Sequence, residues 1–357
     1  MNLHTVSSLS VLRALAIGTA GGALGHVIGI PAPWLAGSLV ATIIAVYSNQ
    51  TLELPDWLRT LAFILLGIQT GTAVNSETLY RAGQWPLSIV CMGVTVGLIV
   101  WACMVYYERL RKWNKATAYF SSLPGALSMV ILLASASKAD MRRVTISQCV
   151  RLFFLIAALP LVIVYISPAP PAFPATPAVA SIFEIIILVG VSAAAGLLFE
   201  RLRVPAGLIL GAALASAALG LGDVIHGGAP DSILIPANII LGVMIALRFK
   251  GISWPELRIS LGDGFAGFAI AMVIAVAGAL FTSQIAGLPL ALTLLAFAPG
   301  GLEAMTIMAF ALNLDPAYVA AHQVARYIGL VLLMPAVTSF VLHRNVPAPQ
   351  PVNVEED

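Results

Sequence analysis

The sequence predicts an all-α integral membrane protein with about ten transmembrane helices, two further re-entrant or broken helices, and two inverted repeats. Hydrophobic residues make up 60% of the chain and charged residues only 10%, with a mean hydropathy of +0.97. A soluble domain carries about 25% charged residues. Because so few charges cannot cover a water-exposed surface, most of the outer surface must face lipid, which makes the bilayer the first predicted partner.

Charge and cysteine content narrow the classes of protein further. The net charge is only +2, and the basic residues are scattered over short loops, which argues against a nucleic-acid partner. Three cysteines, Cys91, Cys103 and Cys149, lie in apolar segments without metal-type spacing. We therefore expect buried thiols and no disulfides.

Twelve apolar segments follow one another along the chain, and a Pro-rich stretch separates the first six from the last six. In order they are Val11–Gly29, Trp34–Tyr47, Leu58–Val74, Trp85–Tyr107, Ala116–Ser137, Val144–Ile166, Ser181–Phe199, Pro205–Leu219, Ile233–Phe249, Leu261–Phe281, Leu290–Leu312 and Ala317–Leu342. The predicted organisation is a first membrane repeat at 1–166, a linker at 167–180, a second repeat at 181–342, and a disordered cytoplasmic tail at 343–357.

The two sets of six segments repeat one sequence pattern. LPGALSMV, beginning at Leu123, aligns without a gap with APGGLEAM, beginning at Ala298, and the alignment continues through the next helix. Pro124 matches Pro299, and Arg151 matches Arg326, in each case 175 positions later. Matches of Pro, Gly, Asp, Gln and Arg in one register indicate a duplication.

Positive charge in short loops indicates that the halves are inverted, because cytoplasmic loops carry an excess of Lys and Arg. The loop Glu108–Lys115 holds four basic residues, whereas its counterpart Thr282–Pro289 holds none. Two other paired loops differ in the opposite direction, as inversion requires. The loop Gly29–Pro33 is uncharged, whereas its counterpart contains Arg201 and Arg203. The loop after the third segment contains one basic residue, Arg81, whereas its counterpart contains Arg248, Lys250 and Arg258.

Inversion requires an odd number of crossings in each half, so one of the six segments should not cross. The fifth, Ala116–Ser137, is interrupted at Pro124-Gly125 and flanked by basic residues on both sides. We expect a re-entrant hairpin there, and another at Pro299-Gly300-Gly301, with both chain termini cytoplasmic. The alternative is a broken helix that crosses fully, which would change the crossing count.

Two broken segments at matching places in inverted halves are typical of the substrate site of a secondary transporter. Backbone groups freed by a break survive in hydrocarbon only where protein buries them or where they line a watered cavity. The alternative is a pair of kinked structural helices. The candidate substrate-binding residues at the breaks are Pro124, Gly125, Pro299, Gly300, Gly301 and Glu303.

The helix after each break adds a polar pair. Gln148 and Arg151 lie three apart on one helix face, and Gln323 with Arg326 repeats the arrangement. Two guanidinium groups facing the breaks would favour an anionic or carboxylate-bearing solute. The alternative is that each Arg pairs with a local acid or caps carbonyls freed by the break. Asp140 and Asp315 precede these helices and are expected to cap them.

Enzyme chemistry has no sequence support, so we expect no catalytic residues, no cofactor and no metal. The sequence contains no Walker A, HExxH or nucleophile-elbow motif. Gly220-Leu-Gly-Asp223 matches the GxGD element of intramembrane aspartyl proteases, but their Tyr-Asp pair is absent.

The opening GGALGHVIGIPAPWLAGSLVAT resembles the start of the AbrB-type membrane protein family, which also carries the label ammonia monooxygenase. LPGALSMV and APGGLEAM resemble that family's repeated Pro-Gly element, so the resemblance covers essentially the whole chain. It implies an inner-membrane protein with a regulatory phenotype. The chain itself shows neither a DNA-binding feature nor the metal ligands of a monooxygenase.

The sequence therefore predicts a secondary transporter of a small, anionic solute, with a membrane-embedded regulator or sensor acting indirectly on gene expression as the alternative. The predicted partners are the bilayer and a small-molecule solute. The sequence leaves open whether the chain forms a homo-oligomer.

Overall fold

The computed structural model describes residues 7–166 and 180–342, apart from residues 75, 84, 126, 136 and 205, and every regular element in this part of the chain is helical. The predicted linker, except Ala180, and the predicted tail lie outside the described residues. The elements are α1 (Ser8–Val27), α2 (Pro33–Tyr47), α3 (Asp56–Thr72), α4 (Ser76–Ala82), α5 (Trp85–Val105), a π-helical segment η1 (Tyr106–Leu110), α6 (Lys115–Ser122), α7 (Leu127–Ser135), α8 (Met141–Ile166), α9 (Ile182–Arg201), α10 (Gly207–Leu221), α11 (Asp231–Leu247), α12 (Trp254–Ala286), α13 (Leu290–Phe297), α14 (Leu302–Ala311) and α15 (Pro316–Leu342).

Local sequence signals explain where several helices begin and end. Ser181 and Glu184 form a capping box at the start of α9, and Ser253 and Glu256 form another at the start of α12. Each box satisfies backbone N–H groups that a helix start leaves free. α12 ends at Gly287, whose positive φ of 63° suits a residue without a side chain. These caps make α12 longer at both ends than the apolar segment Leu261–Phe281 predicts.

The chain is a multi-pass membrane protein by helix length and composition. Six helices are long and apolar enough to cross a bilayer: Ser8–Val27, Trp85–Leu110, Met141–Ile166, Ile182–Arg201, Trp254–Ala286 and Pro316–Met334. The helices α2, α10, α11 and α14 are apolar but shorter. Large apolar side chains are exposed on the outer surface, including Trp101, Leu332 and Phe340, as lipid contact requires.

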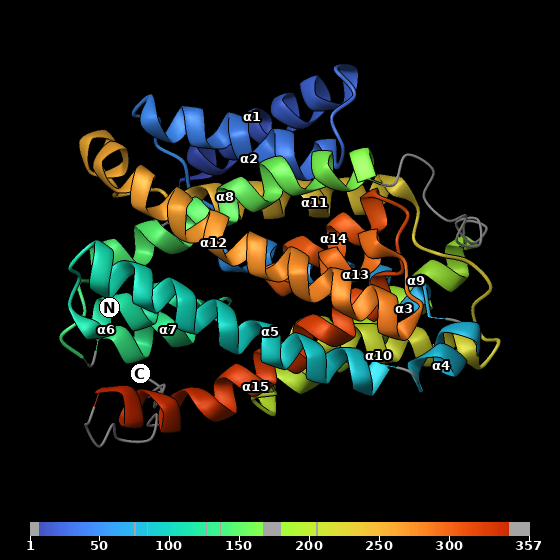
Figure 1. The fold of residues 1–357 in the computed structure, drawn as a ribbon. Helices are drawn as coiled ribbons and strands as arrows, with labels where there is room; N and C mark the ends of the chain where they lie inside the picture. The colour runs from blue at the N-terminus through green and yellow to red at the C-terminus, as the bar shows by residue number, and fades with distance from the viewer. Residues whose placement is uncertain are drawn as a thin grey trace.

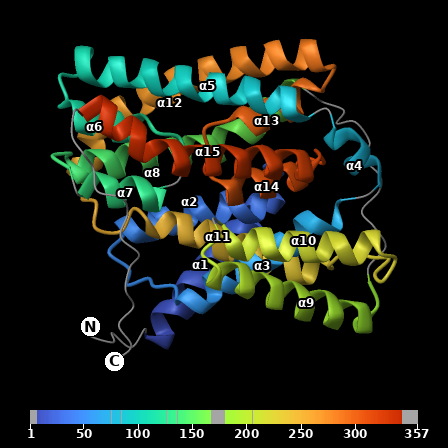
Figure 2. The same ribbon diagram turned by 90° about the horizontal axis from the view of Figure 1, so that it is seen from below.

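Two helix bundles make up the described molecule. The first, here called the six-helix bundle, contains α1, α2, α3, α9, α10 and α11, which pack pairwise against one another. The second, here called the broken-helix bundle, contains α5 to α8 and α12 to α15. In Figure 1, α12 lies beside α5 and α8. Figure 2 shows α5 and α12 along one side of the molecule, and α1 and α9 along the opposite side.

Glycines set the close approaches within the six-helix bundle. A Cβ added to Gly67 on α3 would lie 2.5 Å from the Ile209 carbonyl oxygen on α10. A Cβ added to Gly242 on α11 would lie 2.7 Å from the Leu35 carbonyl oxygen on α2. Only a residue without a side chain permits these crossings. Gly67 and Gly242 are repeat counterparts, and so are Ile209 and Leu35, so both halves make the same contact with each other.

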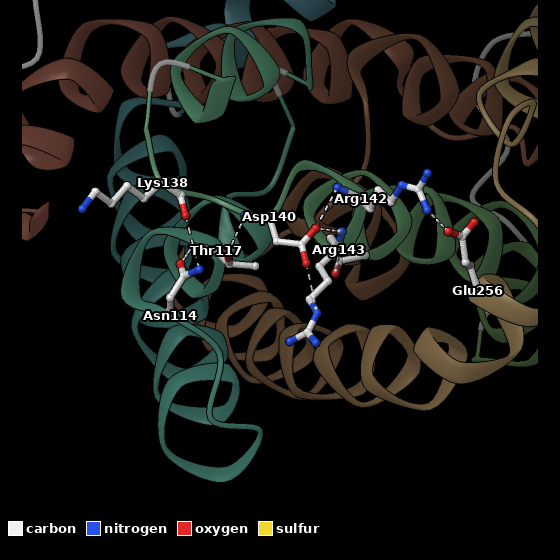
Figure 3. Close-up of polar contacts among 8 residues, drawn as sticks. Asn114, Thr117, Lys138, Asp140, Arg142, Arg143 and Glu256 are labelled. Carbon is white, nitrogen blue, oxygen red and sulfur yellow. Dashed lines mark hydrogen bonds and ion pairs between the residues drawn. The ribbon is translucent and has the colours of Figure 1, made fainter.

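Each predicted broken segment forms two short helices joined by a break. In the first half, α6 and α7 flank residues 123–126, and in the second half α13 and α14 flank residues 298–301. The ends of the first pair lie together (Figure 3): the Asn114 side-chain amide donates to the Lys138 carbonyl (3.3 Å), and the Asp140 N–H donates to the Thr117 hydroxyl (2.8 Å). The pair is therefore a helical hairpin that returns to the end where it began, and not one continuous rod.

Candidate functional site

A cavity of about 280 Å³ lies between the two bundles at the two helix breaks. Its lining comes from α3, the adjoining ends of α9 and α10, the end of α11, both breaks, α8 and α15. A volume near 300 Å³ is at the small end of ligand sites. The lining residues used below are Arg59, Phe63, Pro124, Gly125, Gln148, Arg151, Glu200, Ala206, Leu208, Ile209, Arg248, Gly300, Gly301, Glu303, Gln323, Arg326, Tyr327 and Leu330.

The cavity brings together every site residue predicted from the sequence except Pro299, which is buried and is not among the lining residues. The sequence analysis missed the contribution of the six-helix bundle, chiefly Arg59, Glu200 and Arg248, and also Tyr327 on α15. Arg59 and Arg248 each stand one residue inside the end of a predicted apolar segment, which is a signal that could have identified both. Glu200 lies just past the end of a predicted segment, where a charge is ordinary.

Gln148 and Arg151 on α8 satisfy carbonyl groups at the first break. The Gln148 side-chain amide donates to the Phe120 and Leu123 carbonyls, at 3.1 and 3.0 Å. A terminal nitrogen of Arg151 donates to the same Leu123 carbonyl (3.0 Å) and to the Gln148 side-chain oxygen. Both side chains are buried, with 1% and 6% of their surface exposed.

Gln323 and Arg326 on α15 do the same at the second break. The Gln323 side-chain amide donates to the Ala296 carbonyl (3.2 Å). Arg326 donates to the Ala298 carbonyl (2.7 Å), to the Gly300 carbonyl and to the Gln323 side-chain oxygen. Of the alternatives left open by the sequence, these contacts match carbonyl capping. Among the described residues, no ion pair joins either of the two arginines to an acidic side chain.

The two breaks face each other across the cavity. A Cβ added to Gly125 would lie 3.6 Å from the Gly300 carbonyl oxygen and 3.9 Å from a terminal nitrogen of Arg326. Gly125 has a φ of +89°, a backbone conformation that glycine adopts without steric cost. Residues 175 positions apart in the sequence thus meet at one point.

The cavity has an excess of positive charge. Arg59, Arg151, Arg248 and Arg326 line it with only two acids, Glu200 and Glu303, which gives a formal excess of two positive charges. The Nε atom of Arg151 is buried and has no hydrogen-bond partner. A buried donor without a partner costs about 1–3 kcal/mol.

Helix starts add to the positive potential. α7 begins at Leu127 and α14 begins at Leu302, each directly after a break. Gly301 precedes α14 without a side-chain cap. The N-terminus of a helix carries partial positive charge and free N–H groups, so both helices direct favourable dipoles at the space between the breaks.

The two aspartates act as the sequence predicted. Asp140 accepts from the backbone N–H groups of Arg142 and Arg143, at 3.1 and 3.2 Å (Figure 3). Asp315 accepts from those of Ala317 and Tyr318, at 2.9 and 3.1 Å. Capping fixes where α8 and α15 begin. It thereby fixes the positions of Arg151 and Arg326 along these helices, next to the breaks.

Comparisons with known proteins give matches over most of the chain. A family model described as "Transition state regulatory protein AbrB" matches residues 2–69 and 34–342. A Bacillus subtilis (strain 168) protein, "Uncharacterized protein YhjN", is 26% identical over 365 residues, which cover 92% of each chain. An Escherichia coli (strain K12) protein, "Putative regulator AbrB", is 28% identical over 331 residues, covering 87% of this chain and 90% of the relative.

Proposed function

The chain belongs to the AbrB family of multi-pass membrane proteins, and we propose that it is a secondary transporter of a small anionic solute bound between the two helix breaks. The observation that carries the proposal is the pair Arg151 and Arg326, two buried guanidinium groups without a carboxylate partner among the described residues. An arginine inside a membrane protein is costly, and such residues commonly mark a substrate pathway.

The chemistry of the cavity favours a carboxylate or a similar oxyanion. Guanidinium binds such groups through two parallel hydrogen bonds, and Arg151 retains a free buried donor. The starts of α7 and α14 supply further N–H groups and favourable dipoles. The volume of about 280 Å³ suits a solute of few atoms better than a lipid or a peptide.

The proposed transporter has two inverted repeats, with each hairpin entering from its own side of the membrane. The cavity lining supports inversion, because it contains Arg59 near the start of α3 and Arg248 just after the end of α11. α3 and α11 are repeat counterparts, so corresponding helices run in opposite directions. Lys250 donates to the Leu52 carbonyl (3.2 Å), so the loop after α11 and the loop before α3 lie at the same end. The predicted cytoplasmic side is this end.

Single-cysteine labelling tests this topology in a chain without Cys91, Cys103 and Cys149. Probes at Asn114 and Ala139 should label from the cytoplasmic side, and probes at Gly287 and Asn313 from the opposite side. Labelling of Asn114 and Ala139 from different sides would mean that the first hairpin crosses the membrane, which would contradict the proposed topology.

Ligand binding tests the transport site itself. We would measure the thermal unfolding midpoint of the purified protein with acetate, succinate, citrate or phosphate at constant ionic strength. A ligand at one hundred times its Kd stabilises the folded state by about 2.7 kcal/mol. At least one anion should raise the midpoint, and Arg151→Lys should abolish the shift while Arg142→Lys, at an exposed arginine, should not. An anion found in this way is then assayed for uptake into proteoliposomes.

Two results would contradict the anion site. One is that none of the four anions shifts the unfolding midpoint. The other is that Arg151→Lys and wild type respond equally to the anion that does, which would mean that the anion binds elsewhere.

The second candidate function is a membrane-embedded regulator, and an exposed basic stretch favours it. Arg109, Arg111, Lys112 and Lys115 are exposed next to the base of the first hairpin. Arg111 pairs with Asp263 at 2.5 Å, and the other three could contact an acidic partner. Charge reversal at Arg109 and Lys112 should break a complex with a cytoplasmic protein if regulation is the function, and should leave anion binding unchanged if transport is.

A further inference from the structure

A second cavity, of about 390 Å³, also lies between the two bundles. Its lining comes from the start of α2, the end of α3, the start of α11 and the far end of α14. None of its lining residues belongs to either break.

The two cavities lie at opposite ends of the helices α3 and α11. α3 lines the first cavity with Arg59 and Phe63, near its start, and the second cavity with Gln69 and Thr72, at its end. α11 shows the reverse order, because its start lines the second cavity, whereas Arg248, just after its end, lines the first.

The repeat relates the two cavities residue by residue. Five lining residues of the first cavity have repeat counterparts that line the second cavity. The pairs are Arg59 with Leu234, Phe63 with Asn238, Ala206 with Ala32, Leu208 with Trp34, and Ile209 with Leu35. Even an unusual backbone conformation is shared. Ala206 and Ala32 both have positive φ, 55° and 51°, which is uncommon for alanine. The six-helix bundle therefore presents equivalent positions at both ends, although most of the side chains at these positions differ.

The broken-helix bundle makes the two ends unequal. α14 lines the first cavity with Leu302 and Glu303, and the second with Ile307 and Phe310. Ile307 follows Glu303 by four residues, which corresponds to about 6 Å of helix rise. One short helix thus separates the second cavity from the two guanidinium groups, whereas the first cavity reaches them directly.

We propose that the second cavity is the closed counterpart of the first, and gives access to the same guanidinium pair from the other side of the membrane. The broken-helix bundle shifts along the six-helix bundle, so that the first cavity closes as α14 uncovers the second. This inference rests on the proposed transport function, which gives the second access route its purpose. Its test needs no anion, so either idea can fail without the other.

The test ties the two bundles together across the first cavity. Phe63→Cys on α3 and Leu330→Cys on α15, in the chain without native cysteines, are bridged by a short bifunctional thiosulfonate. Hydrogen–deuterium exchange of the bridged protein in nanodiscs is then compared with that of the unbridged protein. Deuterium uptake should rise in residues 29–36 and 228–238, around the second cavity. It should fall in residues 203–209 and 244–250, around the first cavity.

The matched control bridges Glu200→Cys and Leu208→Cys, which line the first cavity but belong to one bundle. This control bridge should leave deuterium uptake at residues 29–36 and 228–238 unchanged. The proposal is overturned if the bridge across the bundles does not form, because the first cavity then does not close. It is also overturned if the bridge forms without the reciprocal change, or if the control raises uptake equally.

Discussion

The two helix breaks occupy matching positions in the repeat but are not equally satisfied. At the second break, Arg326 donates to two break carbonyls, those of Ala298 and Gly300. At the first break, Arg151 donates to one, that of Leu123, which also accepts from Gln148. The Nε atom of Arg151 is buried and has no hydrogen-bond partner among the described residues. The comparison teaches that matching residues at the two breaks make different contacts: Arg326 donates to two break carbonyls, whereas Arg151 shares its one break carbonyl with Gln148.

The largest effect should come from removing these arginines. Arg326→Ala removes the side-chain donor of the Gly300 carbonyl, at about 1–3 kcal/mol, whereas the Ala298 carbonyl still accepts from the Gly300 N–H (2.8 Å). We therefore expect the free energy of unfolding to fall by about 2 kcal/mol. Arg151→Ala should cost less, because Gln148 still donates to the Leu123 carbonyl. Thermal unfolding midpoints of the purified variants check this order. Equal midpoints would show that the two breaks depend on their arginines equally.

A smaller effect should distinguish the glycines of the two breaks. Gly125→Ala places a Cβ at a φ of +89°, and we expect a cost of about 1–2 kcal/mol. Gly301 has a φ of −87°, and its added Cβ would meet only the Glu303 carboxylate, at 3.0 Å. Gly301→Ala should therefore be nearly neutral in the same unfolding assay. A neutral Gly125→Ala would show that the first break can relax.

The N-cap residues after the two hairpins, Asp140 and Asp315, should differ by less in their contribution to the free energy of unfolding. Asp315 is 7% exposed, whereas the Asp140 side chain is 45% exposed. Loss of an N-cap costs about 1 kcal/mol, within a range of about 0.5–2, so Asp315→Ala should fall near the top of this range and Asp140→Ala near its bottom. Thermal unfolding with Asp→Asn variants as controls measures both, because Asn can still cap. A larger loss at Asp140 would contradict the expected order.

The smallest effect concerns the one acid at the breaks. Glu303 lines the cavity, and its repeat counterpart is Ser128. Glu303→Gln removes a negative charge from the lining and should tighten anion binding severalfold, by about 1 kcal/mol at low salt. Titration of the anion found by thermal unfolding gives the affinities of the wild type and the variant. Weaker binding by Glu303→Gln would assign Glu303 a direct role, such as carrying a proton.

Several parts of the fold could be predicted because they depend on residues that are close together in the sequence. The apolar composition predicts membrane helices, and the Pro-Gly pairs predict breaks at 123–126 and 298–301. The three-residue spacing of Gln148 and Arg151 places both on one helix face, and the structure confirms that both contact the break. Position-by-position matches at an offset of 175 residues identified the second copy of each feature.

Other parts could not be predicted, because they depend on which helices lie next to one another. Arg59, Glu200 and Arg248 reach the cavity only through the packing of the six-helix bundle against the breaks. The helix α4, Ser76–Ala82, was missed because its seven residues are too short and polar for an apolar pattern. The unequal roles of Arg151 and Arg326 were also hidden, since their local sequences are alike.

The sequence by itself determined that this chain lies in a membrane, that matching segments recur 175 positions apart, and that each of the two broken segments is followed by a helix with a Gln-Arg pair. These properties follow from residue type and spacing, which act over a few helical turns. Only the tertiary structure decided that the two breaks meet at one charged cavity, and that a second cavity lies at the opposite end. Such placement depends on close helix crossings, as at Gly67 and Gly242, between segments far apart in the chain.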